Sequence, residues 1–205
     1  MFRLLRNKKV MRWVVGFVAF TFLGGFVGSY ALGSLGNSSA LSADSNSVAN
    51  DLEATTLQLE KDLEMYASLI EASADDVDSW IALGDINYDL AAIYSNYYGQ
   101  DVSSYLGESS AAYQQALSID SERKNLLLSI AMVETYQGHF DDAKSYYEEF
   151  LTLYPKSFDA HALYTQLFFL SGEKETALKW LQMTRDLAQS EEEFDIVNNL
   201  ELMGE

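Results

Sequence analysis

Apolar side chains recur at steps of three and four residues over most of the chain beyond residue 50, and this spacing predicts α-helices. The first such stretch predicts a leading helix over residues 51–73, with its apolar positions on one face. That face consists of Leu52, Thr56, Leu59, Leu63, Tyr66 and Ile70. A free coiled coil is the alternative. The apolar stripe runs straight into the next helical pattern, however, which favours a helix packed on the segment that follows. We expect an all-α fold without strands.

An unbroken apolar run of 23 residues without a charge extends from Trp13 to Leu35. About 20 such residues cross the hydrocarbon core of a bilayer as a helix, so residues 13–35 predict a transmembrane helix. The alternative is a cleaved signal peptide with a weak cleavage site at Ser38-Ser39-Ala40. The apolar part of a signal peptide usually has only about 7–15 residues, so the length of this run favours a signal anchor.

Charge is distributed unevenly around this run. Residues 1–12 hold five basic side chains and no acid, whereas the rest of the chain has 8 basic and 31 acidic residues. Basic segments stay in the cytoplasm, so we expect residues 1–12 to form a cytoplasmic tail and the remainder to be extracytoplasmic at the cell membrane. Residues 36–50, rich in Ser, Asn and Ala, predict a flexible linker. The acidic domain would repel nucleic acid, which excludes that class of partner.

Small residues lie four apart within the apolar run and would share one helix face: Thr21, Gly25, Ser29 and Gly33. This spacing lets two membrane helices approach closely, so a homodimer through this face is one interpretation. Glycine is also common in membrane helices that form no dimer, and that alternative stays open.

A different regularity organises the C-terminal part, where residue types repeat at an interval of 34. Gly138 and Gly172 are separated by this interval, and so are Ala143 and Ala177. Such a period is typical of helix pairs joined by tight turns. Glycine can adopt the positive φ that the turn requires, and alanine is small enough to let the two helices touch.

These motifs resemble the tetratricopeptide repeat. Gly138-His-Phe140-Asp-Asp-Ala143-Lys-Ser-Tyr-Tyr147 is the best match to the repeat's turn and second helix, and Trp80-Ile-Ala-Leu83-Gly84 is similar to the opening of its first helix. Where the family continues with Tyr, this chain has Asn87, with Tyr88 next to it. The positions that carry the resemblance are Trp80, Leu83, Gly84, Tyr113, Ala116, Gly138, Phe140, Ala143, Tyr147, Pro155, Gly172, Ala177 and Leu181.

The resemblance implies an α-solenoid of about three helix pairs within a helical domain over residues 51–205. The pairs are expected at about 77–121, 124–155 and 158–188, followed by a capping helix at 190–202 that covers the last stacking face. Ser190 and Glu193 form a capping-box pattern at its start, and Phe194, Val197 and Leu200 its apolar face.

The first pair contains an insertion of 13 residues around 96–110, which is rich in tyrosine. Either both helices are longer here and the tyrosines pack on one another, or the tyrosines form a contact surface for a partner.

Candidate chemistry is sparse. The two histidines, His139 in an expected exposed turn and His161 in a helix, lie 22 apart without a spacing that directs two ligands to one metal. The chain has no cysteine, Gly-rich phosphate loop or Gly-x-Ser-x-Gly elbow. Its paired acids fall in turns or on solvated faces. We therefore expect no catalytic, metal or cofactor site, and a binding protein instead of an enzyme.

By the resemblance, the first helix of each pair lines a concave face that binds a protein or peptide. Its lining would include Asp78, Ile81, Asp85, Tyr88, Asp89, Asn125, Leu128, Met132, Tyr136, Asp159, Gln166 and Phe169. Relatives that grip a C-terminal carboxylate use Lys, Arg and Asn at such positions. The absence of Lys and Arg here argues against that mode, whereas acids and aromatics suit a partner with basic and apolar side chains.

The sequence thus predicts a membrane-anchored, extracytoplasmic scaffold or adaptor for another protein. Two alternatives stay open. One is an accessory chaperone for secreted or membrane proteins near a secretion channel, and the other is an assembly factor of an envelope complex.

Overall fold

A computed structural model describes residues 45–204, in which every regular element is a helix. In chain order these are α2 (Ser45–Ala72), α3 (Val77–Ile93), a π-helical segment (Tyr94–Tyr98), α4 (Ser103–Ile119), α5 (Leu126–Gln137), α6 (Phe140–Leu153), α7 (Phe158–Leu170), α8 (Lys174–Leu187) and α9 (Glu191–Met203). None of the described helices combines the length and apolarity needed to span a bilayer. The expected transmembrane helix, its small-residue face and the basic tail lie outside the described residues.

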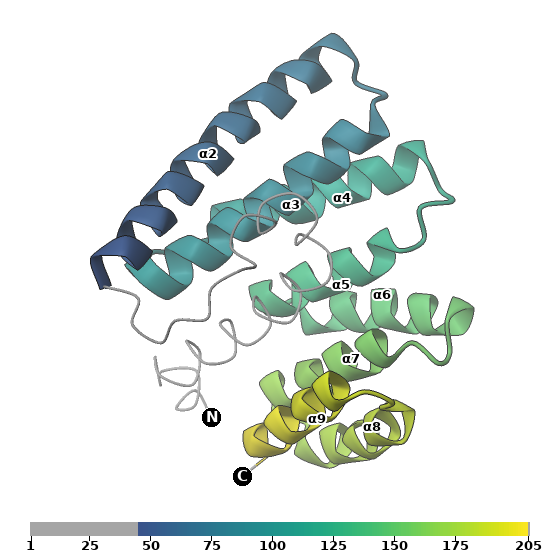
Figure 1. The fold of residues 1–205 in the computed structure, drawn as a ribbon. Coiled ribbons are helices and arrows are strands. Elements are labelled where there is room, and N and C mark those ends of the chain that lie inside the picture. The colour runs from purple at the N-terminus through teal and green to yellow at the C-terminus, as the bar shows by residue number, and fades with distance from the viewer. Residues whose placement is uncertain (1–44, 205) are drawn as a thin grey trace.

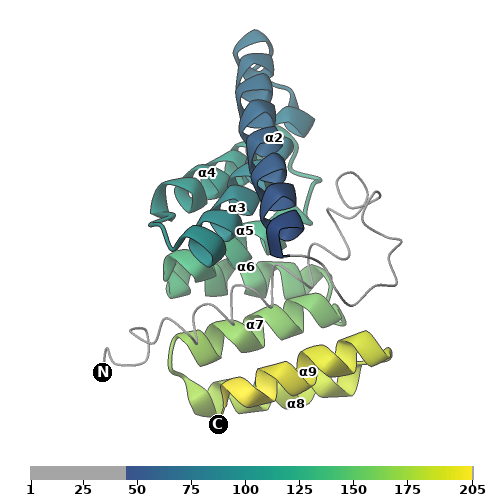
Figure 2. The same cartoon turned by 60° about the vertical axis from the view of Figure 1, so that its left-hand side comes forward.

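Three antiparallel pairs, α3/α4, α5/α6 and α7/α8, stack one below the other, with α2 at one end and α9 at the other (Figures 1 and 2). Small residues lie at the contacts within and between pairs, since Ala116, Ala143 and Ala177 have no exposed surface. The buried clusters join each pair to the next. One of them, for example, contains Ala131 of α5, Tyr147 of α6 and Leu167 of α7.

The turns within the second and third pairs have the same geometry. Gly138 and Gly172 both have φ of 82°, which confirms the expected role of glycine. In each turn, the amide of the following residue donates to a carbonyl near the end of the preceding helix. His139 N–H donates to the Glu134 carbonyl at 2.9 Å, and Glu173 N–H donates to the Phe168 carbonyl at 2.9 Å. The 34-residue period therefore corresponds to a repeated backbone structure.

Helix α2 lies along α3 and packs on it with the apolar stripe that the sequence predicts (Figure 1). Thr56 is buried and the other five stripe positions are half-buried, whereas Leu57, Met65 and Leu69 on the same helix are exposed. The Tyr94 hydroxyl donates to Glu60 Oε1 at 2.6 Å and so links α2 to the end of α3. Packing on the array, and not a free coiled coil, is confirmed.

The tyrosine-rich insertion lengthens both helices of the first pair. Tyr94 stacks on Tyr105 with ring centroids 5.4 Å apart and contacts Tyr98 at 5.7 Å, so part of the group packs on itself. Tyr97 and Tyr98 remain exposed, by 64% and 49%. Packing of the tyrosines on one another therefore describes Tyr94 and Tyr105, whereas Tyr97 and Tyr98 are exposed to solvent.

Helix α9 begins with the expected capping box, in which Ser190 Oγ accepts from Glu193 N–H and Glu193 accepts from the Ser190 amide. Val197 and Leu200 are buried against α7 and α8. Phe194 does not share that burial: it lies in the first turn and is 45% exposed. The last pair is therefore covered by Val197 and Leu200 and not by the first turn of α9.

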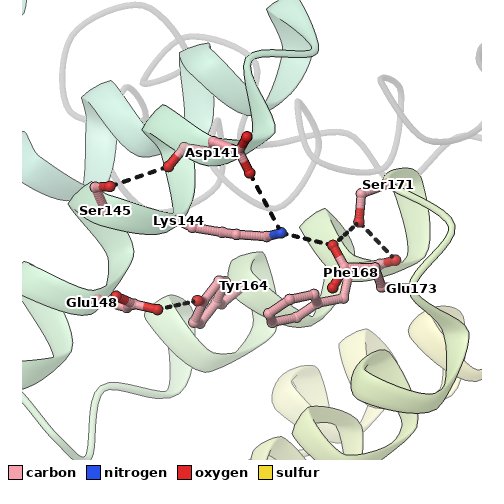
Figure 3. A network of polar contacts seen from close by, with 8 residues as sticks. All are labelled: Asp141, Lys144, Ser145, Glu148, Tyr164, Phe168, Ser171 and Glu173. Carbon is pink, nitrogen blue, oxygen red and sulfur yellow. Dashed lines mark hydrogen bonds and ion pairs between the residues drawn. The ribbon is translucent and has the colours of Figure 1, made fainter.

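A polar network between α6, α7 and the turn before α8 connects the second pair to the third (Figure 3). The Lys144 ammonium of α6 lies 2.7 Å from Glu173, just before α8, and 5.6 Å from the centroid of the Phe168 ring. The Tyr164 hydroxyl of α7 donates to Glu148 of α6 at 3.0 Å. Surface ion pairs contribute little singly, about 0–1 kcal/mol, so the buried apolar contacts hold the joint and the network orients it.

The closest approach within the first pair gives a stability prediction. A Cβ placed on Gly84 of α3 would lie 2.6 Å from Cε1 of Tyr113 on α4. We expect Gly84→Ala to lower the free energy of unfolding by about 1–3 kcal/mol, because the ring is buried and must shift. Thermal or urea unfolding followed by circular dichroism measures this. Gly107→Ala is the matched control, since its Cβ meets nothing within 4 Å in the second turn of α4, and helix propensity there should raise stability by up to ~1 kcal/mol. Equal effects at the two sites would contradict the close approach.

Candidate functional site

The first helices of the three pairs, α3, α5 and α7, follow one another down the stack (Figure 2). We call the side of the array that they form the first-helix face. At its centre, polar side chains from α3, α5 and α7, together with one tyrosine from α4, form a continuous group. This acid–tyrosine cluster comprises Asp85, Tyr88, Asp89, Tyr113, Tyr136 and Gln166.

Two carboxylates one helical turn apart dominate the cluster electrostatically. Asp85 and Asp89 lie at i and i+4 on α3, which places them on the same side of the helix. The Tyr113 hydroxyl donates to Asp85 Oδ1 at 2.6 Å. Neither aspartate pairs with a Lys, Arg or His among the described residues. The pair is therefore two partly desolvated acids without a cation.

This environment changes the protonation of both aspartates. Burial raises the pKa of Asp89 to about 7, and the neighbouring Asp85 carboxylate adds to the shift. Burial also raises the pKa of Asp85, although the hydrogen bond from Tyr113 opposes this. A carboxyl group that loses water and gains a like-charged neighbour favours its neutral form. Asp89 thus changes charge close to neutral pH, far above the usual range of an aspartate.

Aromatic and amide groups continue the cluster onto α5 and α7. The rings of Tyr88 and Tyr136 lie 6.2 Å apart in a tilted arrangement. The Tyr136 hydroxyl interacts with both Tyr88 and Gln166, but the contacts lack hydrogen-bond geometry, and its oxygen and Gln166 Nε2 are shielded from solvent without a partner. Buried polar atoms of this kind are rare and are commonly found where a ligand or water completes the hydrogen bonds.

Apolar residues surround the cluster. Met132 belongs to the buried core between the second and third pairs, and Leu128 and Phe169 are partly buried against that core. Ile81 packs one repeat earlier, against the core of the first pair. The face therefore combines acidic, aromatic and apolar surface, as the sequence pattern suggests.

Three of the predicted binding residues lie apart from the cluster. Asp78 accepts from Arg123 at 2.9 Å, so its charge already has a partner. Asn125 is exposed just before α5. Asp159 begins α7, and loss of hydration together with the Glu193 carboxylate of α9 raises its pKa. These three residues therefore lie at the N-terminal ends of the first helices and not at the centre of the first-helix face.

Sequence reasoning missed two features of this region. It assigned Tyr113 to repeat packing only, although the same residue donates to Asp85 across 28 positions in sequence. It placed His139 correctly in an exposed turn, but it did not predict that its Nδ1 lies 2.7 Å from Oε2 of the buried Glu134. The 34-residue period offered no signal for either contact, because each depends on residues that only one repeat contains. His161, by contrast, packs in a helix as expected, 5.3 Å from the Trp180 ring.

Comparison with known proteins supports the repeat assignment. Residues 135–195 match the family model described as Tetratricopeptide repeat. No curated protein sequence matches the chain. Two solved structures of MamA also match, each with 15% sequence identity and a TM-score of 0.38 over 67% of this chain. The matches cover 86% and 92% of the MamA chains.

The raised pKa of Asp89 predicts a pH-dependent stability. An aspartate in the unfolded chain ionises near pH 4, while Asp89 in the folded chain keeps its proton up to about pH 7. Between these values the folded state binds more protons, so this group's contribution to stability is lost as pH rises. We expect Asp89→Asn to match the wild-type melting temperature near pH 4 and to exceed it near pH 8, by roughly 2–4 kcal/mol in stability. Thermal melts across this range measure the difference.

Asp62→Asn is the control, since that aspartate lies on α2 and accepts a hydrogen bond from Gln58 of the same helix. It should leave the shape of the pH profile unchanged. A constant offset of Asp89→Asn at all pH values would contradict the altered titration.

Proposed function

We propose that this protein is a membrane-anchored, extracytoplasmic scaffold that binds a segment of another protein through the first-helix face. The observation that carries the proposal is the pair Asp85 and Asp89, which is partly desolvated and lacks a cation among the described residues. Arrays of stacked helix pairs commonly serve as binding surfaces for other proteins and not as catalysts.

The chemistry of the face favours a partner segment with basic and apolar side chains. A lysine or arginine placed between the two carboxylates would compensate for their lost hydration and mutual repulsion. The rings of Tyr88 and Tyr136 add surface that attracts a cation. The partly buried Leu128 and Phe169 supply the apolar contact.

The membrane part of the proposal rests on the sequence alone. The uncharged run of residues 13–35 and the basic residues before it are typical of a single-span anchor with its N-terminus in the cytoplasm. Such an anchor confines the repeats to the membrane surface and raises their effective concentration for neighbouring membrane proteins. A homodimer through Thr21, Gly25, Ser29 and Gly33 would double the number of binding faces.

A second candidate function is that of an accessory chaperone or assembly factor for secreted or membrane proteins. The exposed apolar side chains Leu57, Met65 and Leu69 on α2 favour it, because such surface can bind unfolded segments with little sequence preference. The two functions differ in the range of their partners. A scaffold binds one saturable partner, while a chaperone captures many.

Crosslinking and pull-down from membranes, with Asp85→Asn/Asp89→Asn beside the wild type, tests the proposal. We expect the variant to lose a defined partner that the wild type captures, because its positive group would no longer face a carboxylate pair. Glu108→Gln/Glu122→Gln is the matched control, since it removes the same charge from exposed positions outside the first-helix face. Unchanged capture by the aspartate variant would place the binding face elsewhere. Many captured proteins, indifferent to both variants, would favour the chaperone.

A further inference from the structure

The turn between α5 and α6 brings together three metal-ligating side chains that the repeat architecture does not require. Glu134 lies in the last turn of α5, His139 precedes α6, and Asp142 belongs to the first turn of α6. One ligand atom from each of them lies within 4.8 Å of the other two. The positive φ of Gly138 and the bond from His139 N–H to the Glu134 carbonyl fold the chain so that these side chains meet.

We propose that Glu134, His139 and Asp142 form a binding site for a divalent transition-metal ion of the zinc type. The site is independent of the first-helix face and of the function proposed for it. An imidazole nitrogen with two carboxylate oxygens is a donor set that suits Zn²⁺ and related ions. Calcium prefers six to eight oxygen ligands, and magnesium binds mainly through oxygen and water.

The buried carboxylate is held in place by a second set of contacts. Glu134 is only 7% exposed, and its Oε1 accepts from Ser110 Oγ at 2.5 Å. Ser110 is itself buried and accepts from Gln114 Nε2 at 2.9 Å. Hydrogen bonds of this kind orient metal ligands in known sites. Glu134 Oε2 consequently stays directed at His139 Nδ1, 2.7 Å away.

The remaining geometry leaves room for an ion. Ligands about 2.1 Å from a tetrahedral ion are about 3.3 Å from one another. The Glu134–His139 contact must therefore open slightly and Asp142 must move closer. His139 and Asp142 are both exposed, so their side chains can rotate, and solvent can complete the coordination. On binding, the ion takes the place of the proton between Nδ1 and Oε2: a neutral imidazole then carries its proton on Nε2, and an imidazolium releases one proton to water.

The local charge also favours a cation. Neither Glu134 nor Asp142 pairs with a lysine or arginine among the described residues. The two carboxylates therefore face the imidazole without a competing cation among the described residues.

A purely structural role is the competing explanation. In that case the Glu134–His139 contact would only close the turn, and the Asp142 carboxylate would only stabilise α6 by interacting with the positive N-terminal end of its dipole. Such roles would make the three residues important for stability but would give no saturable metal binding. The test must therefore read metal coordination directly.

The full-length chain, purified metal-free in a mild detergent, is titrated with ZnCl₂ by calorimetry and with CoCl₂ by visible absorption. We expect one saturable Zn²⁺ site per chain and a Co²⁺ spectrum with bands typical of a nitrogen ligand, while MgCl₂ and CaCl₂ compete weakly. His139→Ala and Asp142→Asn should each weaken Zn²⁺ binding at least about tenfold. Circular dichroism verifies that each variant is folded, and Asp142→Asn provides the test should His139→Ala unfold.

Asp141→Asn is the matched control, because Asp141 is the adjacent, fully exposed carboxylate outside the cluster. It should bind Zn²⁺ like the wild type. The proposal is wrong if the wild type has no saturable Zn²⁺ site. It is also wrong if folded His139→Ala and Asp142→Asn bind Zn²⁺ with wild-type affinity, since the ion would then be held elsewhere on this acidic chain.

Discussion

The close contact between paired helices is the constraint on which the rest of this structure depends. Two paired helices approach most closely where one of them carries a small residue at the contact. Gly84 serves this purpose in the first pair, where the Tyr113 ring lies against it. Ala131 and Thr165, both without exposed surface, occupy the corresponding place on the first helices of the second and third pairs. Each pair then presents an apolar side to the next, and the array grows by stacking.

This packing contact also determines the candidate site. Because Gly84 has no side chain, Tyr113 can cross from α4 to α3 and place its hydroxyl 2.6 Å from Asp85. The tyrosine thus has an apolar role along its ring and a polar role at its tip. A larger residue at position 84 would displace the ring and with it the hydrogen bond. Stability of the first pair and the electrostatics of the first-helix face are for this reason coupled through one side chain.

Local patterns predicted most of the fold, and contacts between distant residues account for what they missed. The α2 stripe, the turn glycines and the Ser190 capping box each depend on residues within a few turns, which a sequence displays directly. The same periodicity assigns Asp85, Tyr88 and Asp89 to one helix face. Periodicity does not indicate how deeply that face is buried, so it could not predict the raised pKa of Asp89, which burial causes. The ion pair of Asp78 with Arg123 joins residues 45 positions apart, and no local sequence pattern predicts it.

Glu134 and the Asp85–Asp89 pair are both partly buried acids, but their surroundings differ, and the difference bears on function. Glu134 receives hydrogen bonds on both oxygens, from Ser110 and from His139, so its burial is compensated within the protein. Asp89 has no such donor among the hydrogen bonds of the described residues, and its neighbour Asp85 adds repulsion. Folding alone would favour a neutral residue at position 89, because an uncompensated acid lowers stability once it ionises. A carboxylate that weakens the free protein but gains a partner on binding is typical of a recognition site, where the cost in stability is recovered in the complex.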